Sequence, residues 1–331
     1  MYTTVPERPP DVVARDAGDT FLSRTRRWLR LCRCLVLVCR PGQWPKNLLV
    51  VSVPLADLDR WTLAAVGRTA LAILAFTVAA TVVYVLNDIA DHERDRSHPT
   101  KRLRGIASGA VPVRVAAGFG AAALALLVGV MCTQEPVWSL PIVGYLLLSV
   151  AYSLKLKHLP ILDVFAVSAG FALRVLQGFL ATKGTVSIWL LTSVFALCLA
   201  LILGKRRHEL VAFGAAHRPA LQGYTVGLTD RLMTVSAVLT AVAYLLYLRT
   251  EAPLGSLAPA ATLGGVPFAL FGLFRYMQVV EVHQGGENPV RILLRDRAMV
   301  VNSVLWLAQA TAFLVVAHLD GASGLAVTAV S

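Results

Sequence analysis

Long apolar segments separated by charged stretches run along almost the whole chain. Nine segments approach or exceed the roughly 20 residues that a membrane-spanning helix needs. They cover residues 34–57, 62–87, 112–132, 137–154, 160–181, 187–204, 231–249, 257–279 and 298–318. The first contains Pro41, Pro45 and Pro54, and proline interrupts a helix, so we expect a bent or broken start there. The pattern predicts an all-α integral membrane protein with nine transmembrane helices.

Composition agrees with a bilayer as the solvent. Of 331 residues, 56% are hydrophobic and only 15% are charged, whereas soluble domains carry about a quarter charged residues. The net charge is +12, but nucleic-acid binding would need the basic residues gathered on a soluble face. Here they lie between apolar segments, so we expect a membrane partner and no nucleic acid.

Charge alternates between the connecting segments. One set comprises the N-terminal tail and residues 88–111, 155–159, 205–230 and 280–297, and it holds nearly all the lysines and arginines. The other side has only Arg60, Arg68, Lys183 and Arg249. The positive-inside rule then predicts a multi-pass protein of the cytoplasmic (inner) membrane, with the N-terminus cytoplasmic and the C-terminus extracytoplasmic. Residues 1–28 are expected to form a disordered cytoplasmic tail, and residues 29–331 a single transmembrane catalytic domain.

An acidic motif stands at the cytoplasmic end of the second segment. It consists of Asn87, Asp88, Asp91 and Asp95, whose spacings of three, four, seven and eight residues fall on one helical face. Like charges stacked in this way repel, and a hard cation removes that penalty. Magnesium prefers carboxylate oxygens together with phosphate and water. The alternative is a solvated helix end with ordinary surface acids.

A basic stretch follows the acids directly. Arg96, Lys101, Arg102 and Arg104 lie within residues 96–105. Acids followed by cations suit a magnesium-bound polyphosphate, because Lys and Arg neutralise the charge that the metal leaves. We favour Lys101 and Arg102 over the other two as substrate ligands. A plain positive-inside loop would also explain the basic residues.

Other polar residues lie at or inside the apolar segments. Asp163 is near the start of the fifth segment and Arg174 lies three turns deeper; ionisable residues there are site candidates by default. Asp163 could instead complement a helix dipole, and the two could form an internal ion pair. The further candidates at cytoplasmic ends are Lys46, Asn47, Tyr152, Lys155, Lys157, Lys205 and Arg206.

Several common sites are missing from the sequence. The five cysteines have no zinc-binding spacing, and we interpret them as small packing residues. The chain also lacks a nucleotide-binding glycine loop, an HExxH motif and a GxSxG motif.

Taken together in order, the motifs resemble a known family. Asn87-Asp88-x-x-Asp91-x-x-x-Asp95 is similar to the first aspartate-rich motif of the UbiA superfamily of intramembrane prenyltransferases. Within it, the decaprenyl-phosphate phosphoribosyltransferases of actinobacteria have motifs similar to residues 40–47, 95–102, 152–163, 204–209 and 288–290. The resemblance covers about residues 35–318.

This resemblance implies a nine-helix UbiA-type bundle and a magnesium-dependent reaction. A polyprenyl (decaprenyl-like) monophosphate would attack the anomeric carbon of phosphoribosyl pyrophosphate, and pyrophosphate would leave. The product would be an arabinofuranose precursor for cell-wall polymers.

The resemblance also implies roles for the site residues. Asp88, Asp91 and Asp95 would hold Mg²⁺, with Asn87 beside them. Lys101 and Arg102 would neutralise pyrophosphate, and Asp163 would bind the ribose or a second Mg²⁺. Phosphate contacts would come from Lys46, Asn47 and Arg174, with Tyr152 and Lys157 on the opposite wall, and Lys155, Lys205 and Arg206 would supply further cations. A second copy of the chain is a further candidate partner.

Two other functions compete with this one. A UbiA-type prenyltransferase would join a prenyl diphosphate to an aromatic or other small acceptor, and it usually carries a second pair of acids. Here Asp163 has Leu159 and Val167 four residues to either side, which favours the phosphoribosyl branch. A transporter or structural membrane protein would need the charged turns only for topology, and the clustered acids argue against it.

Overall fold

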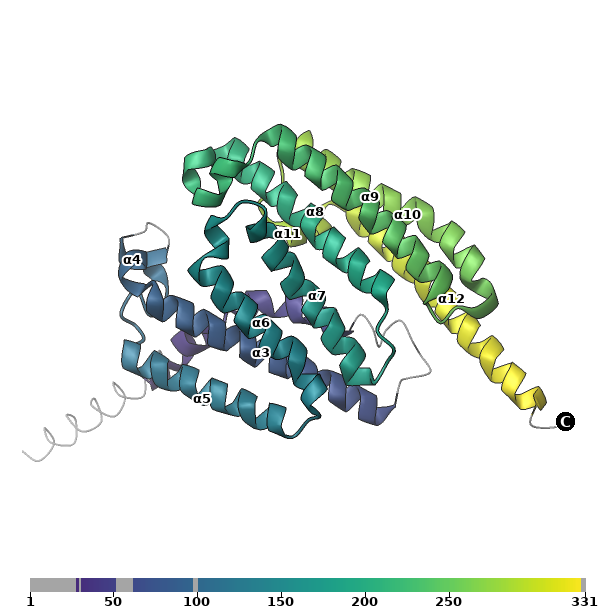
Figure 1. The fold of residues 1–331 in the computed structure, drawn as a ribbon, viewed down its shortest axis with the longest axis horizontal. Helices are drawn as coiled ribbons and strands as arrows, with labels where there is room; N and C mark the ends of the chain where they lie inside the picture. The colour runs from purple at the N-terminus through teal and green to yellow at the C-terminus, as the bar shows by residue number, and fades with distance from the viewer. Residues whose placement is uncertain (1–27, 30, 52–61, 98–100, 329–331) are drawn as a thin grey trace, which may run out of the picture. The chain divides into compact units, whose positions relative to one another are not determined.

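The computed structural model describes residues 28–29, 31–51, 62–97 and 101–328, and every regular element in them is helical (Figure 1). Eight of the helices are long and apolar enough to cross a membrane. They are α3 (Leu63–Ala90), α5 (Val113–Cys132), α6 (Pro136–Leu154), α7 (Leu162–Thr182), α8 (Ile188–Phe213), α9 (Val226–Thr250), α10 (Ala258–Glu281) and α12 (Arg297–Thr328). Short helices lie in the connections between them. These are α4 (His92–Arg96), α11 (Pro289–Arg295) and several 3-10 helices of three or five residues.

Eight of the nine predicted segments are therefore confirmed as helices long and apolar enough to cross a membrane. The first segment differs. Residues 31–38 are helical, and a 3-10 helix, η1 (Pro41–Val51), follows with Pro45 inside it. Proline at this position removes a helical hydrogen bond, which accounts for the break. Residues 52–61 lie outside the described residues, as does the predicted tail over residues 1–27. The count of nine spans thus stays a prediction.

The predicted loop over residues 205–230 is wrong at both ends. Helix α8 continues through residues 205–213 and ends at Gly214, and α9 begins at Val226 with Thr225 capping its first turn. The charged run after Gly204 ends the apolar segment but contains good helix formers, so the helix continues into the polar region. Lys205 and Arg206 consequently lie on a helix.

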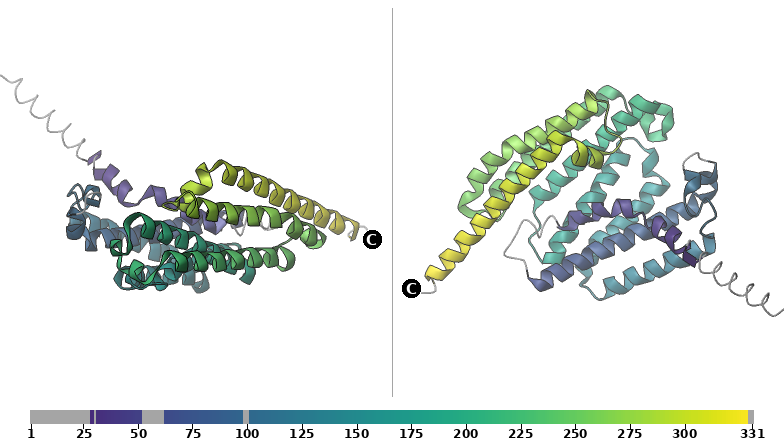
Figure 2. Two further views of the ribbon diagram at one scale, coloured as in Figure 1. Left: turned by 90° about the horizontal axis from the view of Figure 1, so that it is seen from above. Right: turned by 180° about the vertical axis from the view of Figure 1, so that it is seen from behind.

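The chain divides into two compact units. In the described residues, unit 1 comprises 28–44 and 78–127, and its core joins Val38, Val85, Ile106, Val111 and Ala116. Unit 2 comprises 45–77 and 128–328. There α8 packs between α7 and α9, and α10 packs against α9 and α12, as both ribbon views show (Figures 1 and 2). One core cluster of unit 2 includes Val164, Leu203, Leu221, Met233 and Tyr276.

Close contact between α8 and α10 depends on Gly204. A Cβ atom there would lie 2.4 Å from the Tyr276 hydroxyl, which donates a 2.8 Å hydrogen bond to the Leu201 carbonyl. Overpacking a buried contact of this kind costs about 1–3 kcal/mol. We therefore expect Gly204→Ala to lower the midpoint of thermal unfolding in detergent. Gly129→Ala is the control, because a Cβ there meets nothing within 4 Å; an equal loss in both variants would contradict the packing argument.

Candidate active site

Unit 1 carries the acidic motif at the end of α3. Asn87 and Asp88 belong to the last turn of α3, Asp91 precedes α4, and Asp95 lies within α4. Asp88 is only 4% exposed and Asp95 only 3%, whereas Asn87 and Asp91 are half-buried. Residue 91 separates α3 from α4, but the Asp91 N–H bonds the Asn87 carbonyl at 2.9 Å and the Asp95 N–H bonds the Asp91 carbonyl at 2.8 Å. The helical register therefore continues across the motif.

Two arginines neutralise the buried carboxylates. Nη1 of Arg104 lies 3.2 Å from Oδ1 of Asp88 and 2.7 Å from Oδ2 of Asp95, so one guanidinium nitrogen contacts both acids. Nη2 of Arg40 lies 2.5 Å from the same Asp88 oxygen, and its guanidinium stacks 4.6 Å from the centre of the Tyr84 ring. Two negative and two positive charges therefore meet in one small volume.

Lys101 and Arg102, which the sequence favoured as ligands of the substrate, lie just before Arg104 in the chain, and their role stays a prediction. Lys101 and Arg102 are exposed on the 3-10 helix η3 (Lys101–Leu103). Arg104 reaches the acids because the turn after η3 brings its side chain back toward α3. Sequence spacing held no signal for this contact.

The donor set suits a hard divalent cation. No group of three Asp, Glu, His or Cys side chains converges in the residues that the structure describes. Asp88 and Asp95 nevertheless share a single cationic nitrogen, so their oxygens can share a positive charge. Carboxylate oxygens are the ligands that magnesium prefers, and it completes its shell with water and phosphate. Two of the three predicted ligands are thus brought together, and the role of Asp91 stays a prediction.

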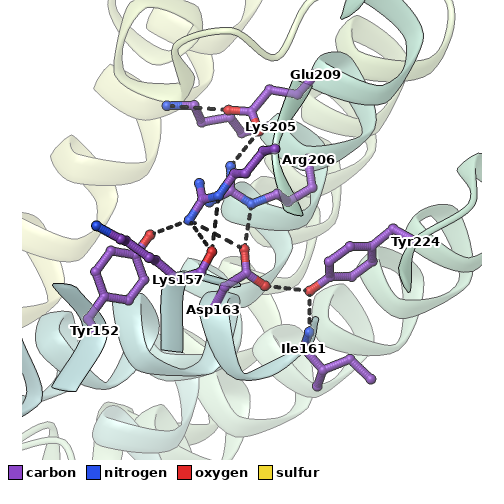
Figure 3. A network of polar contacts seen from close by, with 9 residues as sticks. Tyr152, Lys157, Ile161, Asp163, Lys205, Arg206, Glu209 and Tyr224 are labelled. Atoms are coloured by element: carbon purple, nitrogen blue, oxygen red, sulfur yellow. Dashed lines mark hydrogen bonds and ion pairs between the residues drawn. The ribbon is translucent and has the colours of Figure 1, made fainter. Parts of the chain in front are cut away.

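Unit 2 holds a second polar cluster around Asp163, in the first turn of α7 (Figure 3). Asp163 is fully buried. Nε of Arg206 donates to its Oδ2 at 2.8 Å, and the Tyr224 hydroxyl donates to its Oδ1 at 2.8 Å. Arg206 is 4% exposed and also donates to Glu209 at 2.6 Å. Both oxygens of Asp163 are therefore engaged by the protein itself, from α8 and from the loop before α9.

The loop before α9 is attached to the turn between α6 and α7 at several points. Nη2 of Arg218 donates to the Tyr152 hydroxyl at 2.7 Å and to the Lys157 carbonyl at 3.2 Å. The Tyr224 hydroxyl accepts a 2.7 Å bond from the backbone N–H of Ile161, which has a φ of 67°. A β-branched residue rarely adopts that conformation, so Tyr224 holds a strained turn. Burial and the bond to Asp163 raise the pKa of the Tyr224 hydroxyl, which stays protonated.

The remaining cations of this cluster differ in exposure. Lys205 lies 3.9 Å from Glu209 and is about half exposed, and Lys157 is half-buried beside Tyr152 (Figure 3). Lys155 is exposed at the end of α6. Arg218 and Tyr224, which sequence reasoning missed, come from a stretch without a recognisable motif.

A third polar group of unit 2 surrounds Arg174, which is 6% exposed. Its Nε donates to Oδ1 of Asn47 at 2.8 Å, and Nη1 donates to the Gly170 carbonyl at 2.6 Å. Aromatic rings enclose the guanidinium, with the Tyr145 ring centre at 4.7 Å, Phe76 at 5.4 Å and Phe171 at 5.5 Å. Asn47 is held in turn by a 3.1 Å bond to Thr77.

The alternative interpretation, an ion pair of Arg174 with Asp163, is absent from the described residues, since Asp163 pairs with Arg206. Arg174 also has no other carboxylate partner in that part of the chain. Instead, the charges of Arg174 and Lys205 both act on half-buried Lys46. Two predicted phosphate ligands, Asn47 and Arg174, are therefore brought together by a hydrogen bond, and half-buried Lys46 precedes Asn47 in η1.

Comparison with known proteins places the chain in a family. The model of the UbiA prenyltransferase family matches residues 60–294. The chain belongs to this family. Decaprenyl-phosphate phosphoribosyltransferase of Mycobacterium tuberculosis is 35% identical to it over 286 residues, which cover 83% of this chain and 92% of the relative. The enzyme of the same name from Corynebacterium glutamicum is 32% identical, with coverages of 82% and 84%. Nodulation protein NoeC of Azorhizobium caulinodans is 32% identical over 62% of this chain and 68% of its own.

Solved UbiA structures agree in fold. A UbiA homologue from Archaeoglobus fulgidus bound to GPP and Mg²⁺ has a TM-score of 0.61 at 17% identity, covering 87% of this chain and 99% of its own. A digeranylgeranylglyceryl phosphate synthase has a TM-score of 0.60 at 15% identity, with coverages of 89% and 99%. The predicted UbiA-type, all-α membrane fold is confirmed by these likenesses, and the chain is a multi-pass membrane protein.

Proposed function

We propose that this UbiA family member transfers 5-phosphoribose from phosphoribosyl pyrophosphate to a polyprenyl monophosphate and releases pyrophosphate. A phosphate oxygen of the lipid forms a bond to the anomeric carbon of the ribose. The bond from that carbon to the pyrophosphate oxygen breaks, and pyrophosphate leaves with the electron pair. The relatives named decaprenyl-phosphate phosphoribosyltransferase carry this choice of reaction, because four of them match more than four fifths of the chain.

The cationic cluster of unit 2 supports an anionic substrate. Arg174 is buried, and the positive charges of Arg174 and Lys205 both act on half-buried Lys46. Of these three cations, only Lys205 has a carboxylate within 4 Å in the described residues. Buried positive charge without a counter-ion is costly unless a ligand supplies the anion. We assign this cluster to the binding of a substrate phosphate. Asn47 and the aromatic rings fix the orientation of the Arg174 guanidinium. An arginine fork is suited to phosphate oxygens because it donates two parallel hydrogen bonds.

The acidic cluster of unit 1 supports a magnesium requirement. Asp88 and Asp95 are the residues that would hold the ion, with Asp91 as a third ligand from its half-buried position. When bound, Mg²⁺ would neutralise the negative charge that develops on the leaving pyrophosphate. Lys101 and Arg102 extend from η3 on the same stretch of chain and add cations for the leaving group. The lipid phosphate is already anionic at neutral pH, so positioning and charge stabilisation suffice without a general base.

The proposal includes a membrane orientation. The acidic motif, Asp163 and the basic helix end at 205–213 belong to the positively charged side of the predicted topology, so we place the chemistry at the cytoplasmic face of the cell membrane. The N-terminus is then cytoplasmic, and phosphoribosyl pyrophosphate is a water-soluble substrate of that side. The lipid tail extends along apolar helices in the bilayer.

A radiolabel transfer assay tests the reaction directly. Purified protein in detergent receives labelled phosphoribosyl pyrophosphate, decaprenyl phosphate and Mg²⁺, with EDTA in a parallel sample. We expect label in the organic phase only when Mg²⁺ is present. If no label is transferred while a prenyl diphosphate is consumed with an aromatic acceptor, the protein is a prenyltransferase and the phosphoribosyl proposal is wrong.

Asp91 offers a test of the metal ligands. We expect Asp91→Asn to reduce transfer by about 10–100-fold, the range seen when a metal site loses a supporting carboxylate, while membrane insertion is unchanged. Glu93→Gln is the control, because it removes the same charge from an exposed residue two positions away. Normal turnover by Asp91→Asn would exclude Asp91 from the metal site.

A further inference from the structure

The position of Arg104 between two buried acids points to a role in metal binding itself. Its Nη1 atom contacts Asp88 at 3.2 Å and Asp95 at 2.7 Å. Those acids are 4% and 3% exposed. Two ionised carboxylates so deeply buried repel each other and lose their hydration, so they require a cation between them. In the metal-free protein, Arg104 is that cation.

The second arginine of the cluster is held differently. Arg40 contacts Asp88 alone, and its guanidinium is stacked on Tyr84. A metal ion shared by Asp88 and Asp95 would lie where both acids can reach it, which is the place that the Arg104 nitrogen occupies. Arg40 can keep its stacking and its single contact, whereas Arg104 cannot keep both of its contacts.

Arg104 is also able to move away. Its side chain is 35% exposed, compared with about 5% for the acids it contacts. It follows η3 in a turn region, and no helix longer than three residues lies between it and α4 in the described residues. Once it leaves the carboxylates, its guanidinium remains beside the metal ligands, where phosphate oxygens would be its next partner.

We propose that Arg104 is an internal counter-ion that competes with the metal and transfers to the substrate diphosphate when the metal binds. A metal ion alone must displace Arg104 without giving it a new anion, so it binds weakly. A metal ion that arrives with a diphosphate provides that anion, so metal and diphosphate bind cooperatively. Between turnovers, Arg104 would balance the negative charges of Asp88 and Asp95. It would also disfavour binding of the metal ion without the diphosphate. The inference rests on the proposed magnesium site.

Binding of Mn²⁺, followed by electron paramagnetic resonance of the free ion, separates these steps without any turnover. The probes are Mn²⁺ alone and Mn²⁺ with methylenediphosphonate, a pyrophosphate analogue. For Arg104→Gln we expect Mn²⁺ alone to bind about tenfold more tightly than to the unchanged protein, and the cooperativity with the diphosphonate to fall by a similar factor, both within the usual range of coupling between sites. Arg94→Gln is the matched control, since it removes an exposed arginine of α4, and its Mn²⁺ affinity should stay within threefold.

The outcomes distinguish this inference from the magnesium site on which it rests. If Arg104→Gln binds Mn²⁺ alone no more tightly than the unchanged protein, the counter-ion role is overturned. The metal site itself still stands in that case, provided that Asp95→Asn abolishes binding. If the unchanged protein binds no Mn²⁺ even with the diphosphonate, both are overturned. Arg104→Lys keeps the charge on a shorter side chain, so its affinity for Mn²⁺ alone should lie between those of Arg104→Gln and the unchanged protein. This variant provides the same test if Arg104→Gln does not fold.

Discussion

Replacing Arg206 with methionine is expected to lower the free energy of unfolding by about 3–5 kcal/mol, the usual effect of removing one partner from a buried ion pair. Asp163 is fully buried and Arg206 is 4% exposed, with 2.8 Å between them. Methionine fills a similar volume but leaves the Asp163 charge with the Tyr224 hydroxyl as its hydrogen-bond donor and with Arg218 as a more distant cation, at 4.0 Å. The same substitution releases Glu209, so the loss extends along α8.

The neighbouring residue supplies a matched control. Arg207 also forms an ion pair, 2.6 Å from Asp230, but the side chain of Asp230 is 31% exposed. Solvent-accessible pairs contribute about 0–1 kcal/mol, so Arg207→Met should change stability little. The measurement is unfolding in detergent, by heat and by denaturant. Equal effects of the two substitutions would show that burial does not decide the energetics of Arg206.

A double substitution tests whether the charge itself is responsible. In Asp163→Asn with Arg206→Met, no buried charge is left at this position, and we expect much of the lost stability to return. The coupling free energy between the two sites should then be well above the few tenths of a kcal/mol found for independent positions. Strict additivity would contradict the ion-pair explanation.

Sequence patterns predicted the helices well because lipid imposes a strong condition on them. Backbone groups in a bilayer must be satisfied within the helix, so each span needs a long apolar segment. The helix ends were predicted less well, because hydropathy marks where the apolar segment ends. Helix α8 shows the difference: its apolar part ends near Gly204, yet the helix continues to Phe213. In η1 the prolines predicted an irregular start, but not its 3-10 form.

The acids of the candidate site could be found from spacing, and their partners could not. Helical periodicity brings Asp88 and Asp95 to one side irrespective of the rest of the fold. Arg104 reaches them through the turn after η3, whereas the sequence favoured the neighbouring Lys101 and Arg102. Asp163 pairs with Arg206, 43 positions away, and with Tyr224, 61 positions away. Contacts across such separations depend on tertiary packing, which a single sequence does not reveal.

The largest expected effect on activity concerns Arg174. We expect Arg174→Gln to reduce phosphoribosyl transfer by about 10²–10³-fold, the range observed when one preorganised donor to developing charge is removed. The side chain of Arg174 is buried, bonded to Asn47 and Gly170, and enclosed by three aromatic rings. These contacts hold the guanidinium in one orientation before substrate arrives. Glutamine can retain a hydrogen bond to Asn47 but has no charge to offer a phosphate.

Arg174→Lys separates charge from geometry. Lysine restores the positive charge but lacks the planar fork, and it cannot stack as a guanidinium does. If the fork is what binds phosphate, Arg174→Lys should remain much closer to Arg174→Gln than to the unchanged protein. Recovery to near-normal transfer would mean that only the charge is needed. Arg68→Gln is the structural control, since Arg68 also donates to a carbonyl of α7, that of Ala181, and lies outside the proposed phosphate cluster.

Folding must be separated from function in this comparison, and the environment of Arg174 makes that feasible. Its charge has no carboxylate partner within the described residues, so its removal leaves no buried anion behind, in contrast to Arg206. Arg174→Gln should therefore elute as a single species on size exclusion and unfold near the normal temperature in the absence of substrate. A stable variant with transfer within threefold of normal would remove Arg174 from the phosphate site. A stable variant that is inactive would leave the unpaired guanidinium with one explanation, the binding of a substrate anion.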